Sequence, residues 1–286
     1  MAVWGKEGFK RIIHDIRNAQ FRSKFCDELP KLVGHAGIGV ISDYEDQPLL
    51  ISSHLGPYAI VTVGAVRNLD RLVQDAFRNG AHFSEMSEGV VNPTEVVAML
   101  INTQSRFADG LRYAQMRVEG SCSILLLTRE GLYAARDRWG RTPIVIGRKA
   151  DTFAVSFESC AFPNLGYEGV RDLGPGEVIR LSSDGFTVEY EPLPAMRICA
   201  FLWIYYGFPA STYEGRNVEE ARNRCGENLA RRDTTEVDIV CGIPDSGIGH
   251  ALGYASARGL PYRRPFVKYT PTWARSFMPQ DQRVRD

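Results

Sequence analysis

Six short runs of β-branched and apolar residues follow one another between residues 121 and 190. Turn signals such as Ser183-Asp184-Gly185 separate them, as is typical of the ends of strands. Connections this short join antiparallel neighbours, because parallel neighbours need a crossover of a dozen or more residues. The pattern therefore predicts antiparallel sheet, with strands at 121–128, 131–136, 143–148, 153–158, 177–182 and 186–190.

The residues before this region predict a mixture of strand and helix. Residues 58–66 form an apolar run with strand character, and Asn68 is a good N-cap for the helix that follows. One face of that helix would carry Leu69, Leu72, Val73 and Phe77. A second helix is expected to begin at Pro93, since proline suits the first helical position. Residues 1–194 are thus expected to form an α+β domain.

A different pattern occupies residues 237–255. Val237, Ile239 and Val240 indicate a buried strand, and a turn at 244–247 precedes a helix with apolar residues at helical spacing. Backbone N–H groups and a helix N-terminus converge on a phosphate in such a layout. An ordinary strand-to-helix turn, capped by Asp245 or Ser246, explains the same residues about equally well.

Residues 195–286 are expected to hold only the first part of a second domain. The segment 218–232 predicts an amphipathic helix. A parallel α/β sheet needs several βα units, and too few residues follow 255 to supply them.

Composition excludes several classes of function. The sequence holds 34 basic and 34 acidic residues, which gives no support to nucleic-acid or membrane-surface binding. No apolar run approaches about 20 residues, and no signal peptide is visible. The cysteines are scattered, as in a cytoplasmic protein with reduced, buried thiols, and no spacing indicates a metal site. They lie at positions 26, 122, 160, 199, 225 and 241.

Seven segments, in matching order over nearly the whole chain, resemble one family, the glutamine phosphoribosylpyrophosphate (PRPP) amidotransferases. They are G-L-Y-A-A-R-D-R-W-G-R-T-P-I-V-I-G (131–147), S-F-E-S-C-A (156–161), D-L-G-P-G-E-V (172–178), C-A-F-L-W-I-Y-Y-G-F-P-A-S (199–211), R-N-V-E-E-A-R-N-R-C-G-E (216–227), I-P-D-S-G-I-G-H-A-L-G-Y-A (243–255) and V-K-Y-T-P-T-W-A-R-S-F-M-P-Q-D-Q-R (267–283).

The resemblance implies a fold and an activity. Residues 1–194 would form the αββα sandwich of the N-terminal-nucleophile hydrolases, and 195–286 an incomplete α/β type I phosphoribosyltransferase domain. The family releases ammonia from glutamine and uses it to displace pyrophosphate from PRPP, which yields phosphoribosylamine for purine synthesis. No cofactor is expected in this chain. A complete form is expected to use Mg²⁺ with PRPP and to be a homo-oligomer.

The resemblance also implies that the glutaminase site is degenerate. The family nucleophile is an N-terminal cysteine, whereas the first cysteine here is Cys26, expected to be a buried thiol. The family has further residues ahead of the segment that 6–9 matches, so Met1 is compatible with an internal start. Ser42 stands in place of the arginine that clamps the glutamine carboxylate. Val63 stands in place of the amide that would stabilise the oxyanion, because V-T-V-G-A-V aligns with the family's A-H-N-G-N-L. Pro93 lies at or near the position of the acid that holds the glutamine amine. No catalytic residue is therefore assigned.

For the transferase half, the resemblance assigns pyrophosphate binding to a few residues. They are Asp245, Ser246, Gly247, Lys268 and Arg275. The family's pair of adjacent acids with a Ser/Thr-rich loop is not found, and the nearest acidic pair, at 45–46, is expected to be solvated.

Two further expectations concern an iron–sulfur cluster and the function of the chain. Cys199 falls at the first cysteine ligand of the cluster that some members carry, but a cluster needs about four thiolates, so a buried free thiol is expected. The alternative to an amidotransferase is a non-catalytic, glutaminase-fold binding or regulatory module.

Overall fold

The computed structural model describes residues 1–15, 21–42, 45–84, 86–87 and 89–268. The chain divides into two compact units, Met1–Cys199 and Ala200–Asp286, and each is described by itself.

The first unit is built on a six-stranded antiparallel sheet with the order β14-β13-β9-β8-β5-β4. Its central pair, β5 and β8, places Ile60 opposite Leu126. The pair lies at the centre because its apolar side chains are buried on both faces of the sheet. The strands are β4 (Leu49–Ser53), β5 (Gly56–Val66), β8 (Gly120–Thr128), β9 (Gly131–Ala135), β13 (Val178–Ser182) and β14 (Gly185–Tyr190).

Two three-stranded sheets, β2-β1-β3 and β11-β10-β12, pack on one face of the main sheet. One apolar cluster joins Ile146 to Ile179, and another joins Ile38 to Val61. The strands are β1 (Ala2–Gly5), β2 (Gly8–Arg11), β3 (Ala36–Ile38), β10 (Val145–Lys149), β11 (Thr152–Ser156) and β12 (Glu168–Asp172). All the pairings are antiparallel, so the predicted sheet-on-sheet layer is confirmed.

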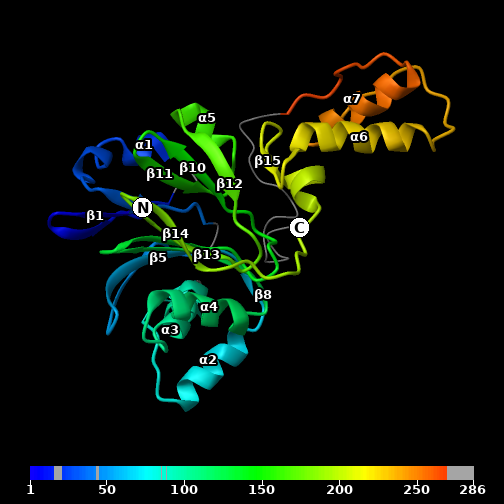
Figure 1. Cartoon of the computed structure of the whole chain (residues 1–286). Helices are drawn as coiled ribbons and strands as arrows, with labels where there is room; N and C mark the ends of the chain where they lie inside the picture. The colour runs from blue at the N-terminus through cyan, green and yellow to red at the C-terminus, as the bar shows by residue number, and fades with distance from the viewer. Residues whose placement is uncertain (16–20, 43–44, 85, 88, 269–286) are drawn as a thin grey trace. The chain divides into compact units, whose positions relative to one another are not determined.

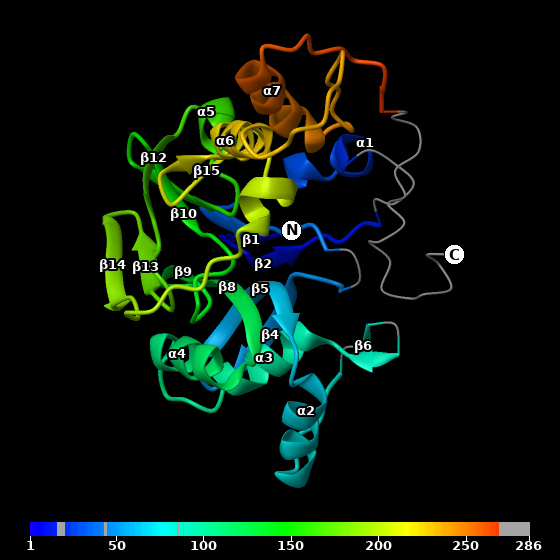
Figure 2. The ribbon, with the colours of Figure 1, turned by 90° about the vertical axis from the view of Figure 1, so that its right-hand side faces the viewer.

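Helices cover the opposite face of the main sheet (Figures 1 and 2). The largest apolar cluster packs the helices against β5 and β8, with Val97, Leu111, Ile60 and Ile124 among its members. These helices are α2 (Leu69–Arg78), α3 (Pro93–Ile101) and α4 (Phe107–Arg117). The shorter elements are α1 (Phe21–Phe25), η1 (Leu29–Lys31), α5 (Ala161–Leu165) and the pair β6 (Met86–Ser87) with β7 (Val90–Val91).

All six predicted strands of 121–190 and the two predicted helices are present, with three differences. Strand β12 was not predicted, because it is largely exposed and carries no apolar alternation. The Asn68 side chain does not cap α2, since it bonds the Arg117 carbonyl and the Glu119 N–H instead. Phe77 is 53% exposed rather than part of the buried face.

The second unit packs two helices, α6 (Val218–Ala230) and α7 (Gly247–Arg258), after a short π-helix η2 (Leu202–Tyr206) and the pair β15 (Thr212–Tyr213) and β16 (Arg216–Asn217). Glycines let the two helix backbones meet. A Cβ added at Gly226 would lie 1.9 Å from the His250 carbonyl oxygen, and one at Gly253 would lie 2.0 Å from that of Asn223. Arg222, 2% exposed, donates to the carbonyls of Trp203, Tyr205 and Gly207.

The predicted buried strand at 237–240 is wrong. Val237 and Ile239 are 39% and 50% exposed, and the segment makes a single parallel bridge, from Val240 to Tyr262. A strand needs a neighbour along its length to pair its N–H and C=O groups. The described residues of this unit supply that neighbour only at the bridge.

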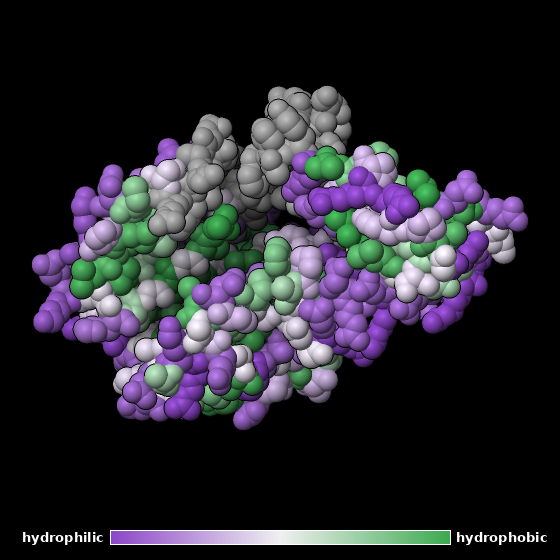
Figure 3. All heavy atoms as spheres, turned by 90° about the horizontal axis from the view of Figure 1, so that it is seen from above, coloured by the Kyte–Doolittle hydropathy of each residue, from purple (hydrophilic) through white to green (hydrophobic). Residues whose placement is uncertain are grey.

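Within the described residues, no helix is long and apolar enough to cross a membrane. The surface of both units mixes apolar and hydrophilic side chains (Figure 3). In the second unit the exposed apolar side chains include those of Ile243, Phe266 and Val267.

Candidate functional site

The three positions that the resemblance places in the glutamine site lie in the first unit. Ser42 is exposed, and its hydroxyl accepts a hydrogen bond from the Glu45 N–H at 3.0 Å. Val63 lies near the end of β5 and is 39% exposed. Pro93 is the first residue of α3, where it needs no N–H partner. None of the three supplies a charge or a side-chain amide to a ligand.

A polar network joins the neighbours of these positions. Glu45 Oε2 accepts from the Thr94 hydroxyl at 2.6 Å and from the Thr94 N–H at 3.3 Å. The Thr94 hydroxyl lies 2.6 Å from that of Thr62. Gln47 Oε1 accepts from the Thr62 N–H at 2.7 Å, and its Nε2 donates to Glu45 and to the Thr62 carbonyl. The expectation that Glu45 is merely solvated is therefore wrong.

The buried cysteine of this unit, Cys122, offers no activated thiolate. Cys122 is 5% exposed, and burial, with Glu45 and Asp137 nearby, raises the pKa of its thiol. A thiol with a raised pKa stays protonated and is a poor nucleophile. Cys26 is exposed, not buried as expected, and its sulfur lies 3.7 Å from the Ser23 carbonyl.

The charged pair Arg136-Asp137, which follows β9, holds the surrounding backbone by hydrogen bonds. Arg136 is fully buried and donates to the carbonyls of Leu173 and Gly140. The carboxylate of Asp137 accepts from the N–H groups of Trp139 and Thr142. The two charges are therefore paired with backbone groups of the loop that follows β9 and, at Leu173, of the segment that follows β12, a role that the sequence did not indicate.

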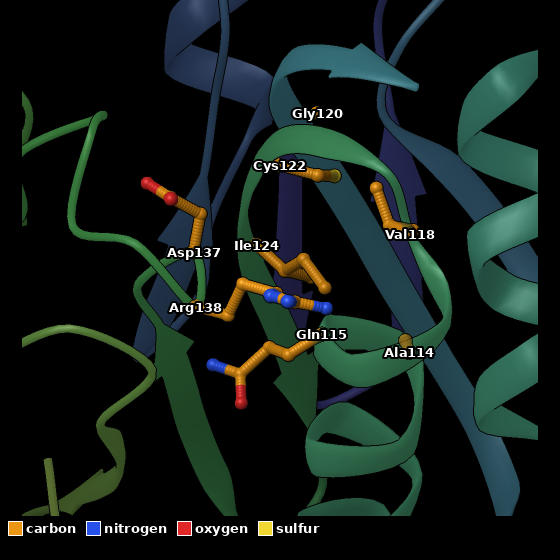
Figure 4. A pocket seen from close by; sticks show the side chains of 8 residues that line it. All are labelled: Ala114, Gln115, Val118, Gly120, Cys122, Ile124, Asp137 and Arg138. Carbon is orange, nitrogen blue, oxygen red and sulfur yellow. The ribbon is translucent and has the colours of Figure 1, made fainter. Parts of the chain in front are cut away.

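A small cavity lies between α4 and β8 (Figure 4). Its volume is about 10 Å³, which is room for a single water molecule. It is therefore not a substrate pocket. Its lining residues are Ala114, Gln115, Val118, Gly120, Cys122, Ile124, Asp137 and Arg138.

In the second unit three of the predicted pyrophosphate residues, Asp245, Ser246 and Gly247, lie at the N-terminus of α7. The structure brings two of the predicted residues together, since Lys268 Nζ lies 3.5 Å from Asp245 Oδ2. Both side chains are substantially exposed, at 41% and 61%, so an anion in solution would reach them. Arg275 lies outside the described residues.

The backbone of this loop differs from the expected anion cradle. The N–H of Gly247 donates to the Ile243 carbonyl at 3.0 Å, and that of Ile248 donates to the Asp245 carbonyl at 3.2 Å. Gly247 is not among the glycines with positive φ, and Ser246 makes no side-chain cap. Two of the N–H groups expected to hold a phosphate are thus already paired.

A different glycine shapes this loop. A Cβ at Gly242 would lie 2.8 Å from both the Gly247 carbonyl oxygen and the Ile248 Cα. A side chain at position 242 would therefore push the start of α7 away. The sequence indicates the turn at 244–247 but not the role of Gly242, because a turn signal shows where a chain bends and not which backbone atoms meet.

The described residues contain no group of three or more His, Cys, Asp or Glu residues that could hold a metal ion. All six cysteines are free thiols, as expected. Cys199, however, is exposed rather than buried.

Three comparisons agree on the relatives of this chain. A glutamine amidotransferase domain model matches residues 36–164. The amidophosphoribosyltransferase of Bacillus subtilis (strain 168) is 32% identical over 271 residues, which cover 91% of this chain and 56% of that protein. The corresponding protein of Methanocaldococcus jannaschii is 30% identical and covers 85% of this chain.

Solved structures give the same result. The PRPP amidotransferase of B. subtilis in complex with ADP and GMP matches with a TM-score of 0.75 and 31% identity, over 90% of this chain and 57% of that one. This similarity extends to the fold of the glutamine amidotransferase domain, the N-terminal-nucleophile hydrolase sandwich described above. The chain spans about half the length of these relatives, and it is similar to amidophosphoribosyltransferases over most of its own length.

Proposed function

We propose that this chain is part of an amidophosphoribosyltransferase-like protein that forms 5-phosphoribosylamine from PRPP, and that its glutaminase half is inactive. Ammonia, rather than glutamine, would then be the nitrogen donor. The observation that carries the proposal is the loop at 243–247, which leads into α7 and has Lys268 beside Asp245. Because this loop lies at a helix N-terminus and beside a cation, it suits a pyrophosphate group.

We further propose that the second unit is the first part of a type I phosphoribosyltransferase domain. The support is a short parallel pairing across a helix. The Val240 N–H donates to the Pro261 carbonyl at 3.0 Å, and the Arg263 N–H donates to the Val240 carbonyl at 2.9 Å, with α7 as the connection. Two parallel segments joined by a helix are the start of a βαβ unit, from which such domains are built.

Magnesium would arrive as part of the substrate. Asp245 is the acidic residue of the loop and is paired with Lys268, and the described residues form no metal-binding cluster. They do not fit a Mg²⁺ ion held by the protein alone. A Mg²⁺–PRPP complex needs no such cluster, because the phosphates supply most of its ligands. A homo-oligomer is proposed for the complete form.

Glutamine hydrolysis is expected to be absent. Ser42 and Val63 supply neither the carboxylate clamp nor the oxyanion donor. The purified chain should release no glutamate from glutamine above the buffer background. The double variant Ser42→Arg, Val63→Asn should remain inactive, because Pro93 still stands at or near the acid that holds the glutamine amine. Glutamate release by the unmodified chain would contradict the assignment of the site.

Pyrophosphate and PRPP are expected to bind weakly. Two loop N–H groups are already paired, and an anion must compete with Asp245 for Lys268. We expect millimolar dissociation constants, about −4 kcal/mol, by calorimetry. Lys268→Ala should weaken binding, whereas Lys149→Ala, an exposed lysine of β10, should not. Micromolar binding of PRPP would mean that a second half-site exists, and binding unaffected by Lys268→Ala would remove this loop from the proposal.

A non-catalytic binding or regulatory module is the second candidate. The polar network around Glu45 favours it, since the chain's own side chains fill that region of the first unit. Consumption of PRPP with ammonia by the longest natural form of this protein distinguishes the two candidates. Turnover supports the enzyme, and its absence in a form that binds PRPP supports the module.

A further inference from the structure

The network around Glu45 has one consistent arrangement of its hydrogen atoms. An ionised carboxylate only accepts hydrogen bonds, so the Thr94 hydroxyl must donate its proton to Glu45. Thr94 Oγ1 must then accept from the Thr62 hydroxyl, 2.6 Å away. The amide of Gln47 fixes the other end, because it pairs with both backbone groups of Thr62. The negative charge of Glu45 thus determines which way the hydroxyl protons of Thr94 and Thr62 point.

The partners of Glu45 are buried. Thr94 is fully buried, and Thr62 and Gln47 are 8% and 6% exposed. Their polar atoms face the start of α3, where Asn92 accepts from the Thr94 N–H at 2.8 Å and from the Glu95 N–H. The partly buried carboxylate of Glu45 adds its charge at this positive helix end. One carboxylate can therefore bind to donors that are already in place, which come from the start of α3, the buried hydroxyls and Gln47.

The location of this network connects it to the degenerate glutamine site. Each substituted position adjoins or contacts a member of the network. Ser42 accepts from the Glu45 N–H, Val63 follows Thr62 in β5, and Pro93 precedes Thr94 in α3. An external carboxylate bound at the start of α3 would have to displace Glu45 from the hydroxyl and the N–H of Thr94.

We infer that Glu45 is an internal ligand of this site, an autoinhibitory contact in which the chain's own carboxylate occupies the place of an external one. The inference rests on the proposed function, because that proposal identifies the region as a former glutamine site. The class of external ligand excluded by Glu45 is a small carboxylate or an α-amino acid.

The inference is tested first by chemical rescue. Glu45→Ala should lower the folding equilibrium constant about 10- to 100-fold in urea unfolding, since it removes hydrogen bonds to a charged acceptor. Sodium acetate at ten times its dissociation constant should raise the folding equilibrium constant of Glu45→Ala about tenfold. Sodium chloride at equal ionic strength should not raise it. Glu119→Ala, which removes a surface ion pair with Arg71, is the matched control and should change stability little. The double variant Glu45→Ala, Thr94→Val should lose the acetate effect.

A second measurement tests the class of ligand. Glutamate and glutamine, titrated by calorimetry, should bind Glu45→Ala at least tenfold more tightly than the unmodified chain. If Glu45→Ala does not fold, Glu45→Gln serves instead, because it keeps an acceptor for Thr94 and loses only the charge. It should lose part of the stability, whereas stability equal to that of the unmodified chain would overturn the inference.

Four results overturn the inference. They are unchanged stability in Glu45→Ala, unchanged stability in Glu45→Gln, a loss that acetate does not restore, and glutamate binding that is equal with and without Glu45. None depends on turnover, so failure here leaves the proposed transferase function standing. Conversely, a failure of PRPP binding leaves the result on Glu45 intact.

Discussion

Replacing Gly253 by alanine should unfold the second unit or pull its two helices apart. The added Cβ would lie 2.0 Å from the Asn223 carbonyl oxygen of α6, and backbone cannot move aside as a flexible side chain can. Overpacking usually costs 1–3 kcal/mol, and we expect about 3 kcal/mol or more here, because α6 and α7 form the main contact of this unit. Urea unfolding followed by helical circular dichroism measures the loss.

The same helix supplies a graded series of controls. Gly247→Ala meets nothing closer than 3.6 Å and should change stability by less than about 1 kcal/mol. At Gly249 the nearest atoms are Glu219 Oε2 at 2.8 Å, the end of a flexible side chain, and the Cβ of buried Arg222 at 2.9 Å, so an intermediate cost is expected. Equal effects at 247 and 253 would show that the helices do not meet through their backbones.

Replacing Arg136 by alanine should destabilise the first unit by about 3–5 kcal/mol. The change leaves the buried carbonyls of Leu173 and Gly140 without their charged donor and opens a cavity in place of a fully buried side chain. Arg136→Lys should recover only part of the loss, because one ammonium group cannot reproduce the planar fork of a guanidinium.

The control for Arg136 is Arg129→Ala, which removes an exposed arginine from the preceding turn and should cost less than about 0.5 kcal/mol. Thermal or urea unfolding of the whole chain compares the two. If Arg136→Ala were as stable as Arg129→Ala, the buried charge of Arg136 would contribute nothing to the stability of the first unit.

The sequence predicts the elements of the first unit well, because their signals are local. Each strand of 121–190 is bounded by its own turn residues, and Pro93 marks the start of α3 by its ring alone. Where a prediction failed, the deciding atoms come from elsewhere in the chain. Residues 237–240 have strand composition, but a strand forms only beside a neighbour, and the described structure offers one only at Tyr262.

The candidate site shows the same limit. Glu45 was expected to be solvated, yet its main partner, Thr94, lies 49 residues further along the chain. Gly226 and Gly253 look like ordinary helix weaknesses in the sequence, and their packing role depends on how α6 and α7 meet. Cys199 was expected to be a buried free thiol, but it is exposed, and Phe201, two residues further on, is itself 49% exposed. Burial is a property of the assembled fold, not of neighbours in the sequence.

One glycine of β5 is required by the fold itself. Gly64 has φ +142°, and a Cβ there would lie 1.9 Å from the Ser121 carbonyl oxygen of β8. The resemblance places Gly64 at the glycine of the oxyanion segment and Val63 at the amide beside it. Pairing of β5 with β8 requires the glycine, whereas the side chain at 63 is 39% exposed and less constrained by packing. A residue of a catalytic motif that also serves the fold is thus constrained twice, and one that serves only a substrate is constrained once.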